Sequence, residues 1–171
     1  MGNMIHIDGS YGEGGGQILR TCLSLATITG QPIRIDRLRA GRKKPGLAPQ
    51  HLTAVRAAAA ICEATVQGDR PGSMTLEFIP NRPPQAGRYA FDVNEAAAAG
   101  SAGAITLILQ AILLPLVMAG GNSVVTLKGG THVPWSPPVT YLEGVYLPTL
   151  RQMGVEAQVE LRSWGVYPRG G

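Results

Sequence analysis

The chain is poor in charged and aromatic residues. Asp, Glu, Lys and Arg make up only 15% of its 171 residues, and Phe, Trp and Tyr make up 5%. With two phenylalanines and two tryptophans, the sequence lacks the aromatic platform on which single-strand-binding modules stack bases. Its hydrophobic content of 44% is sufficient for a packed core, so we expect one ordinary globular domain or two small ones.

Motifs of several common enzyme classes are also missing. The sequence contains no Gly-x-Ser-x-Gly, which removes support for a hydrolase triad, and no Gly-Lys-Ser/Thr of a Walker A loop. Gln17 stands where the dinucleotide-binding fingerprint needs its third glycine. The histidines, His6, His51 and His132, have no companion His, Cys or carboxylate at metal-ligand spacing.

The cysteine content and the N-terminus predict a cytoplasmic protein. Cys22 and Cys62 fall at apolar positions of helix-patterned segments, which favours core thiols in a reducing compartment over a disulfide or redox pair. The N-terminus has no basic region followed by a long apolar run, so no signal peptide is predicted. Residues 102–121 are apolar, but Gln110 and Pro115 interrupt them, so we expect a buried helix and no membrane association.

Positive charge is concentrated in one short segment. The net charge is +4, yet residues 34–44 alone carry six basic side chains and one acid, a local +5, which leaves the rest of the chain at −1. A local excess of this kind predicts a phosphate-bearing ligand or nucleic acid, with a solvated basic loop as the alternative. The basic residues are Arg34, Arg37, Arg39, Arg42, Lys43 and Lys44.

Hydrophobic periodicity predicts alternating strands and helices throughout the chain. The first half is expected to contain strands at 4–8, 32–38, 65–68 and 73–80, and helices at 17–29 and 49–64. The second half is expected to contain strands at 89–93, 123–128 and 155–161, and helices at 101–119 and 138–153.

The same order of elements occurs twice. Equivalent helices begin at 17 and 101 and equivalent strands at 32 and 123, offsets of 84 and 91 residues, which indicates two copies of one βαβαββ unit. We therefore predict an α/β (α+β) fold in which each unit packs two helices on a four-stranded sheet. The expected units are residues 1–85 and 86–171. The second stops before its last strand, so a piece of a longer protein is favoured over a complete one.

The segment DGSYGEGGGQILR, residues 8–20, is the strongest chemical motif. Glycines surround Glu13 just before a helix, where backbone amides approach an anion closely and the helix N-terminus favours negative charge. Arg20 lies one turn into that helix, on a polar stripe that continues to Ser24. Glu13 is expected to bind Mg²⁺ or Mn²⁺, because a phosphate beside it needs an intervening cation. The alternative is a tight turn with a solvated Glu and a surface Arg.

Four further side chains are candidates for the same site. Arg39 and Arg42 belong to the basic loop, and arginine forks fit phosphate geometry. Gln50 stands at the start of the second helix, directly after that loop, where ligands are often bound. Gln110 lies within an apolar helix, where a buried, unpaired amide would cost about 1–3 kcal/mol, so a backbone group or a ligand should meet it.

Together these residues resemble the RNA 3'-terminal phosphate cyclase family. The resemblance runs through the whole chain in five blocks that keep the family's order and spacing: DGSYGEGGGQILRT, ITGQPIRIDRLRAGRKKPGLAPQHLTAV, AGSAGAITLILQ, KGGTHVPWSPP and GVYPRGG. It implies an RNA-processing enzyme of the ligase class that uses ATP to convert an RNA 3'-phosphate into a 2',3'-cyclic phosphate. In that family a histidine is adenylylated, AMP passes to the RNA phosphate, and the neighbouring 2'-OH displaces AMP.

The resemblance also implies a fold, a set of ligands and roles for particular residues. The family has three such units and a small inserted domain, and the two units here match the first two. The implied cofactors are ATP and Mg²⁺ or Mn²⁺, and the implied partner is an RNA 3'-phosphate end. Glu13 would hold the metal, and Gln110 and Pro137 would contact the adenosine. The residues that would bind ATP or phosphate are Glu13, Arg20, Arg39, Arg42, Gln50, Gln110 and Pro137.

The sequence departs from the family pattern at one point. The family's nucleophilic histidine lies in the third unit, and His6, His51 and His132 do not match it. No catalytic residue is therefore assigned within these 171 residues, and the chain alone is expected to form no covalent adenylate. The alternative function is that of the non-catalytic relatives that act in ribosome assembly. The intact set of phosphate-binding residues disfavours it, and the motifs of the enolpyruvyl transferases, which share a repeat-built fold, are not seen.

Overall fold

The first half of the chain forms one complete βαβαββ unit. The structure is a computed structural model, and it describes residues 3–97 and 101–171. The elements of the first half are β1 (Ile5–Asp8), α1 (Gly16–Thr29), β2 (Ile33–Asp36), α2 (Pro49–Cys62), β3 (Thr65–Gln67) and β4 (Leu76–Ile79). Each lies where the periodicity predicts it, although the strands are shorter because only their central residues pair.

The four strands form one sheet in the order β1-β2-β4-β3. β1 runs parallel to β2, and β4 runs antiparallel to both of its neighbours. β4 therefore follows β3 in sequence but lies between β2 and β3 in space. Alternate residues point to opposite faces, so Ile33, Ile35, Leu76 and Phe78 are buried on one face, while their neighbours Arg34 and Glu77 lie on the other.

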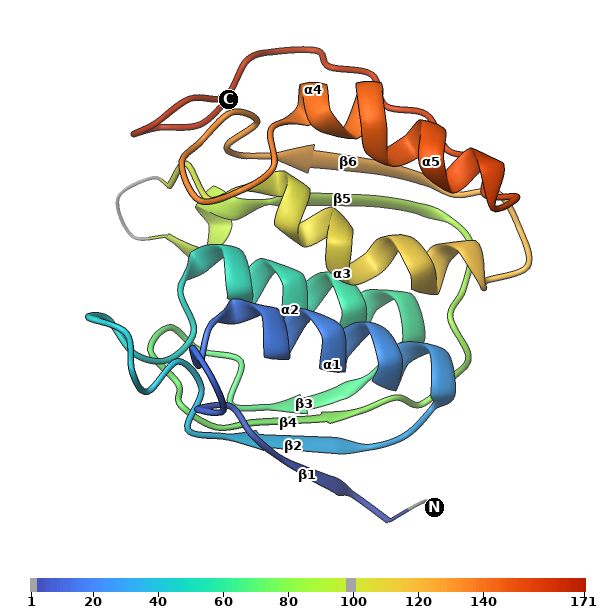
Figure 1. The fold of residues 1–171 in the computed structure, drawn as a ribbon. Coiled ribbons are helices and arrows are strands. Elements are labelled where there is room, and N and C mark those ends of the chain that lie inside the picture. Colours follow the sequence, from blue (N-terminus) through green and yellow to red (C-terminus); the bar gives the residue numbers. More distant parts are fainter. Residues whose placement is uncertain (1–2, 98–100) are drawn as a thin grey trace.

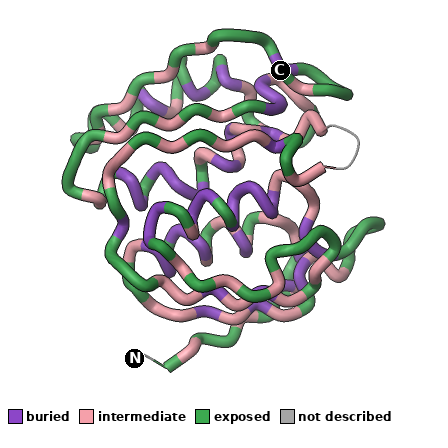
Figure 2. The backbone as a smooth tube through the Cα atoms, turned by 180° about the vertical axis from the view of Figure 1, so that it is seen from behind, coloured by how far each residue is buried: buried purple, intermediate pink, exposed green. Residues whose placement is uncertain are grey.

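Two helices, α1 and α2, cover the apolar face of this sheet (Figure 1). α1 and α2 pack on it, and their buried residues form one core with the inward side chains of β2 and β4. Leu19 and Leu23, one turn apart on α1, are fully buried in that core. The tube coloured by burial shows the buried segments concentrated along these central helices (Figure 2).

The second half begins as a repeat of the first. Its elements are β5 (Arg88–Asp92), a 3₁₀ turn (Val93–Ala96), α3 (Ile105–Val117), β6 (Val124–Lys128), α4 (Val139–Tyr141), a π-helical segment (Leu142–Tyr146) and α5 (Leu147–Gln152). α3 packs against α1 and α2, so the helices lie between the four-stranded sheet and the parallel pair β5–β6 (Figure 1). The fold is mixed α and β, as predicted.

One predicted strand is absent from the structure. Residues 155–161 were expected to form a strand, but they belong to no sheet. Odd-numbered residues of this segment are half-buried and even-numbered ones exposed, so the alternation that predicted a strand is real. In the first half β3 obtains its hydrogen bonds from β4. Within residues 3–97 and 101–171 no strand lies beside 155–161, and an unpaired extended segment is not a strand.

The cysteines and the apolar helix agree with the sequence predictions. Cys22 and Cys62 are free thiols on neighbouring helices, and burial raises the pKa of both. α3 contains Pro115 and begins at Ile105, four residues later than predicted, with the backbone amide of Ala104 bonded outside the helix. None of the helices in the described part of the chain has the length and apolar character needed to cross a membrane.

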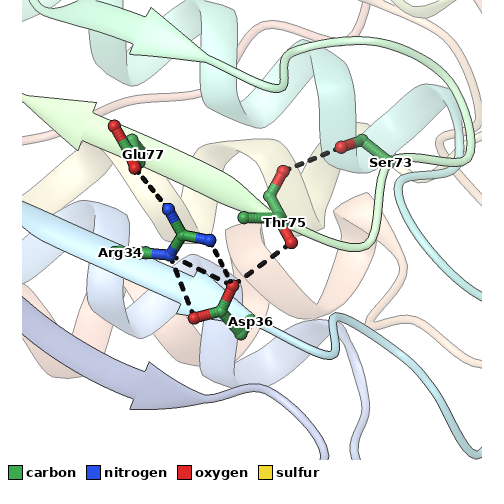
Figure 3. Close-up of polar contacts among 5 residues, drawn as sticks. All are labelled: Arg34, Asp36, Ser73, Thr75 and Glu77. Carbon is green, nitrogen blue, oxygen red and sulfur yellow. Dashed lines mark hydrogen bonds and ion pairs between the residues drawn. The ribbon is translucent and has the colours of Figure 1, made fainter.

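A polar network covers the outer face of the four-stranded sheet. Arg34 on β2 donates to both carboxylate oxygens of Asp36 and, at 2.6 Å, to Glu77 on β4 (Figure 3). Thr75 donates to Asp36 at 3.2 Å. The hydrogen bond from Arg34 is the main reason that the pKa of Asp36 lies below its usual value.

Substitution of Arg34 with Met should therefore change the acid sensitivity of the sheet. A lowered pKa in the folded state means that Asp36 stabilises the fold above pH about 4 and loses this effect as the pH falls further. We expect the difference in unfolding free energy between wild type and Arg34→Met to be constant above pH about 4 and to shrink below it. Urea unfolding from pH 2.5 to 6 measures this, with Gln67→Met on the exposed face of β3 as control. A difference that does not depend on pH would contradict the assignment.

Candidate anion-binding site

The glycine turn between β1 and α1 presents an open helix N-terminus. Gly12 and Gly14 have φ values of 60° and 55°, which favour glycine, and they carry the chain from β1 to Gly15 at the start of α1. Asp8 fixes the start of the turn by accepting hydrogen bonds from the amide and hydroxyl of Ser10, which lower the pKa of its carboxyl. Among the described residues no side chain caps α1, and its first turn has no acid. Its leading amides and positive dipole end therefore have no side-chain acceptor or acid to compensate them.

Three basic or donor side chains converge on this helix end. A Cβ atom at Gly15 would lie 3.0 Å from Nη2 of Arg42. A Cβ atom at Gly16 would overlap Nε2 of His51 and lie 3.0 Å from Nη1 of Arg20. The three donors come from α1, from the basic loop and from α2. They surround the same two glycines, a geometry that fits a phosphate group.

His51 was missed as a site residue at the sequence level. Its side chain is 5% exposed, and its Nδ1 accepts a hydrogen bond from the Ala48 amide at 3.3 Å. Burial, followed by the positive charges of Arg39 and Arg20, lowers its pKa to about 3. His51 is therefore neutral near pH 7, with its proton on Nε2, the atom beside Gly16. The sequence signal that could have identified His51 is its position next to Gln50 at the start of α2.

Arg20 is held by the second half of the chain. Its Nε donates to Oε1 of Gln110 on α3 at 2.8 Å, across 90 positions of sequence. Burial lowers the pKa of Arg20, in keeping with its position between α1 and α3. The amide of Gln110 thus meets an arginine, where the sequence predicted a backbone group or a ligand. The predicted polar stripe was partly wrong, because α3 packs against that side of α1 and Ser24 is buried.

Some charges of the basic loop are paired within the protein, and others remain available to a ligand. Arg34 is paired with carboxylates on the sheet, and Arg37 is paired with Asp8. Arg39 donates from Nη1 to the Gly46 carbonyl at 2.7 Å, and burial, then the charge of Arg42, lowers its pKa. The positive charge that the loop leaves unpaired is therefore smaller than the count of basic residues predicts.

Arg42 is the loop arginine that reaches the glycine turn. Its Nη2 lies 3.0 Å from Oε2 of Glu13, whose side chain is 89% exposed. Such an exposed pair is weak, so either partner can exchange it for a ligand. The described residues contain no group of three or more His, Cys, Asp or Glu that could hold a metal ion by themselves. A cation bound at Glu13 would need phosphate oxygens as further ligands, which is the usual arrangement for Mg²⁺.

A cavity of about 330 Å³ adjoins the start of α2. Its lining includes Gln50, Ala104, Trp135, Ser136 and Tyr167. Oε1 of Gln50 accepts a hydrogen bond from the Ala104 amide at 2.9 Å, which joins α2 to the start of α3. Gln50 and His51 are adjacent at the start of α2, so this helix end contributes one residue to the cavity and one to the glycine turn.

The structure therefore brings some of the predicted site residues together and leaves others apart. Glu13, Arg20 and Arg42 meet at the glycine turn, and Gln50 lines the neighbouring cavity. Arg39 is turned to the backbone of its own loop. Pro137 is exposed outside the cavity lining, next to Ser136, and its carbonyl accepts a hydrogen bond from Thr106 at 2.8 Å.

Comparison with known proteins places the chain in a family. Residues 11–171, which include every candidate residue above, match the family model described as RNA 3'-terminal phosphate cyclase. The chain belongs to the RNA 3'-terminal phosphate cyclase family. A protein named RNA 3'-terminal phosphate cyclase from Nostoc punctiforme is 70% identical over 168 residues, which cover 98% of this chain and 48% of that protein.

Relatives of the same name come from other organisms as well. The one from Methylococcus capsulatus is 58% identical over 98% of this chain and 46% of its own length. The one from Archaeoglobus fulgidus is 48% identical over 98% of this chain and 49% of its own length. The chain thus spans about half the length of the curated cyclase relatives that it matches.

Proposed function

We propose that this chain supplies the phosphate-binding half of an ATP-dependent RNA 3'-phosphate cyclase, an enzyme of the ligase class. The reaction converts an RNA 3'-phosphate into a 2',3'-cyclic phosphate through enzyme–AMP and RNA–adenylate intermediates. The observation that carries the proposal is the convergence of Arg20, Arg42 and His51 on the uncapped N-terminus of α1. Such a set of donors has an evident use in holding a polyphosphate or a phosphorylated RNA end.

The proposed roles differ among the donors. Arg42 would exchange its exposed pair with Glu13 for a phosphate oxygen, which releases Glu13 to hold Mg²⁺ or Mn²⁺. The cation would neutralise charge on the phosphates of ATP. Arg20 offers a guanidinium whose orientation is fixed by Gln110. His51 donates one uncharged hydrogen bond from Nε2, so its contribution would not depend on pH near neutrality.

The cavity beside Gln50 is the proposed place for the nucleoside. Gln50 in its lining is adjacent to His51 at the glycine turn, so a nucleotide could extend past the start of α2 from one to the other. Its volume of about 330 Å³ accommodates a base and sugar. The adenosine would then lie near Pro137, whose neighbour Ser136 lines the cavity.

The adenylylation step requires a nucleophile that we do not find in this chain. His51 is the histidine at the phosphate site, but it is buried, and its Nδ1 already accepts the Ala48 amide. We therefore expect the 171-residue chain to bind ATP without forming a covalent adenylate. Incubation with α-labelled ATP and Mg²⁺ or Mn²⁺ tests this. Acid-labile label on the protein would refute it.

The overall function is tested by cyclisation of a 3'-phosphate RNA, with and without ATP, by a protein of the relatives' length that contains these residues. ATP-dependent formation of the cyclic phosphate is expected. Binding of ribosomal precursors without cyclisation would instead favour the non-catalytic role in ribosome assembly.

Replacement of Arg42 with Ala separates a phosphate site from a solvated basic loop. Loss of one charged hydrogen bond to phosphate should weaken ATP binding by about 1–3 kcal/mol, or roughly 5- to 150-fold. Lys43→Ala is the matched control, since Lys43 is an exposed neighbour in the same loop. Calorimetric titration with ATP and Mg²⁺ measures both variants. Equal affinities for the two variants would reassign Arg42 to the solvated loop.

A further inference from the structure

The cavity beside Gln50 is lined by aromatic side chains from two different segments of the chain. Trp135 belongs to the loop between β6 and α4, and Tyr167 belongs to the C-terminal segment 164–171. Trp135 is 99% exposed and Tyr167 is 76% exposed, so neither ring contributes much to the core. The low aromatic content of the chain therefore does not exclude a local surface on which a base could stack.

The backbone at Trp135 has a conformation that a bulky residue rarely adopts. Its φ is 66°, in the left-handed region that favours glycine, and this conformation lowers the stability of the folded chain. Because Trp135 is almost fully exposed, packing of its ring does not offset that cost. A strained residue that adds so little to the fold is expected to serve a ligand, and the ring of Trp135 lines the cavity.

Hydrogen bonds fix the two aromatic segments relative to each other. The Thr131 amide donates to the Gly165 carbonyl at 2.8 Å, and the Gly165 amide donates to Oγ1 of Thr131 at 2.9 Å. Both of these residues are buried. The amides of Gly129 and Gly171 each donate to the carbonyl of the other, at 2.9 and 3.0 Å. The two segments are therefore held together before any ligand binds, and such preorganisation favours binding.

The surroundings of the cavity indicate the chemistry of its ligand. Its remaining lining is largely apolar and includes Ala104, Leu107 and Val133, so it fits a flat ring that the aromatic faces can cover. Gln50 in the lining is adjacent to His51, which lies at the proposed phosphate site. A planar base joined to phosphate matches both places, and a nucleotide is such a molecule.

We propose that Trp135 and Tyr167 form a stacking site for a nucleobase, with Trp135 supplying most of the affinity for the base. The inference rests on the proposed function, because it places the phosphate of the same ligand at the glycine turn. The base belongs either to ATP or to the RNA nucleotide that carries the 3'-phosphate, since both present the same stacking face. Stacking tolerates any base, so these two residues supply affinity and not a choice among bases.

Fluorescence of Trp135 tests the stacking directly. The chain has two tryptophans, and Trp164 lies outside the cavity lining, so Trp164→Phe leaves Trp135 as the reporter. We expect quenching by ATP with Mg²⁺ or by a 3'-phosphorylated RNA dinucleotide, and none by pyrophosphate or ribose 3-phosphate, which have no base. Quenching by ATP alone assigns the base to ATP, and quenching by the dinucleotide alone assigns it to RNA. Quenching by neither, or equally by the base-free ligands, would overturn the proposal.

Replacement of Trp135 with glycine separates stacking from a structural role. The variant loses the ring but relieves the strained backbone, so its melting temperature should not fall. It should bind the quenching nucleotide about 5- to 150-fold more weakly, the range for loss of one base stack. Trp164→Phe should bind it as the wild type does. Pyrophosphate should bind all three proteins equally, because it reaches only the glycine turn.

The same titrations distinguish failure of this inference from failure of the proposed function. If pyrophosphate binds normally and the folded Trp135→Gly protein keeps wild-type affinity for the nucleotides, the stacking site is wrong and the phosphate site stands. If calorimetry shows that neither pyrophosphate nor ATP binds the wild-type chain, the phosphate site is wrong and the stacking site fails with it.

Discussion

Substitution of Gly16 with alanine is expected to weaken phosphate binding by this chain roughly 100-fold. The new methyl group would overlap Nε2 of His51 and press against Arg20, so two of the three converging donors would lose their positions. His51 has little freedom to move, because it is buried and bonded to the Ala48 amide. Loss of two hydrogen bonds to an anion corresponds to about 3 kcal/mol, or roughly 100-fold in affinity. Calorimetric titration with ATP or pyrophosphate measures it.

The matched control for this experiment is Gly41→Ala. Gly41 lies in the basic loop, and a Cβ atom there would meet no described atom within 4 Å. The phosphate affinity of the Gly41→Ala protein should equal that of the wild type. Unfolding of both variants must be followed in parallel, so that lost binding is not confused with lost structure. Wild-type affinity in a folded Gly16→Ala protein would place the anion site elsewhere.

Acid should destabilise the protein through His51. Its pKa is about 3 in the folded protein against an ordinary value of 6.5, so between these values the unfolded chain binds a proton that the folded chain does not. Stability due to His51 is complete above pH 6.5 and is lost as the pH falls toward 3, at about 1.4 kcal/mol per pH unit. At pH 4.5 the loss is about 2–3 kcal/mol relative to pH 7.

A variant that lacks His51 separates this effect from the titration of carboxylates. The His51→Gln protein cannot take up this proton, so its unfolding free energy should fall less than that of the wild type between pH 7 and pH 4.5. Urea unfolding at half-unit pH intervals measures both proteins. Parallel curves for wild type and His51→Gln would show that His51 is not held neutral.

The sequence predicted those parts of the fold and site that depend on local pattern. Helical spacing located α1 and α2, and the glycine turn before α1 identified the helix end and its nearest arginine. The role of His51 could not be predicted, because its burial and direction arise from the packing of α2 beside α1. The same holds for Arg34, whose charge is shared between Asp36, two residues away, and Glu77, which is distant in sequence.

Residues 155–161 show what alternation does and does not predict. Their period of two correctly indicated which side chains turn inward, since that depends on the residues themselves. Pairing depends on a neighbour, and within the described ranges none lies beside this segment. A strand is a property of two segments, so no pattern within one of them can establish it.

The hydrogen bond between Arg20 and Gln110 makes the proposed phosphate site a reporter of how the two halves are packed. One donor of the proposed site belongs to α1, and the residue that orients it belongs to α3. A ligand that binds only when Arg20 is correctly oriented therefore favours the packed arrangement of these helices, and by linkage it raises the melting temperature as its concentration increases. The coupling is reciprocal, so loosening α3 would weaken phosphate binding without touching any group that contacts the ligand.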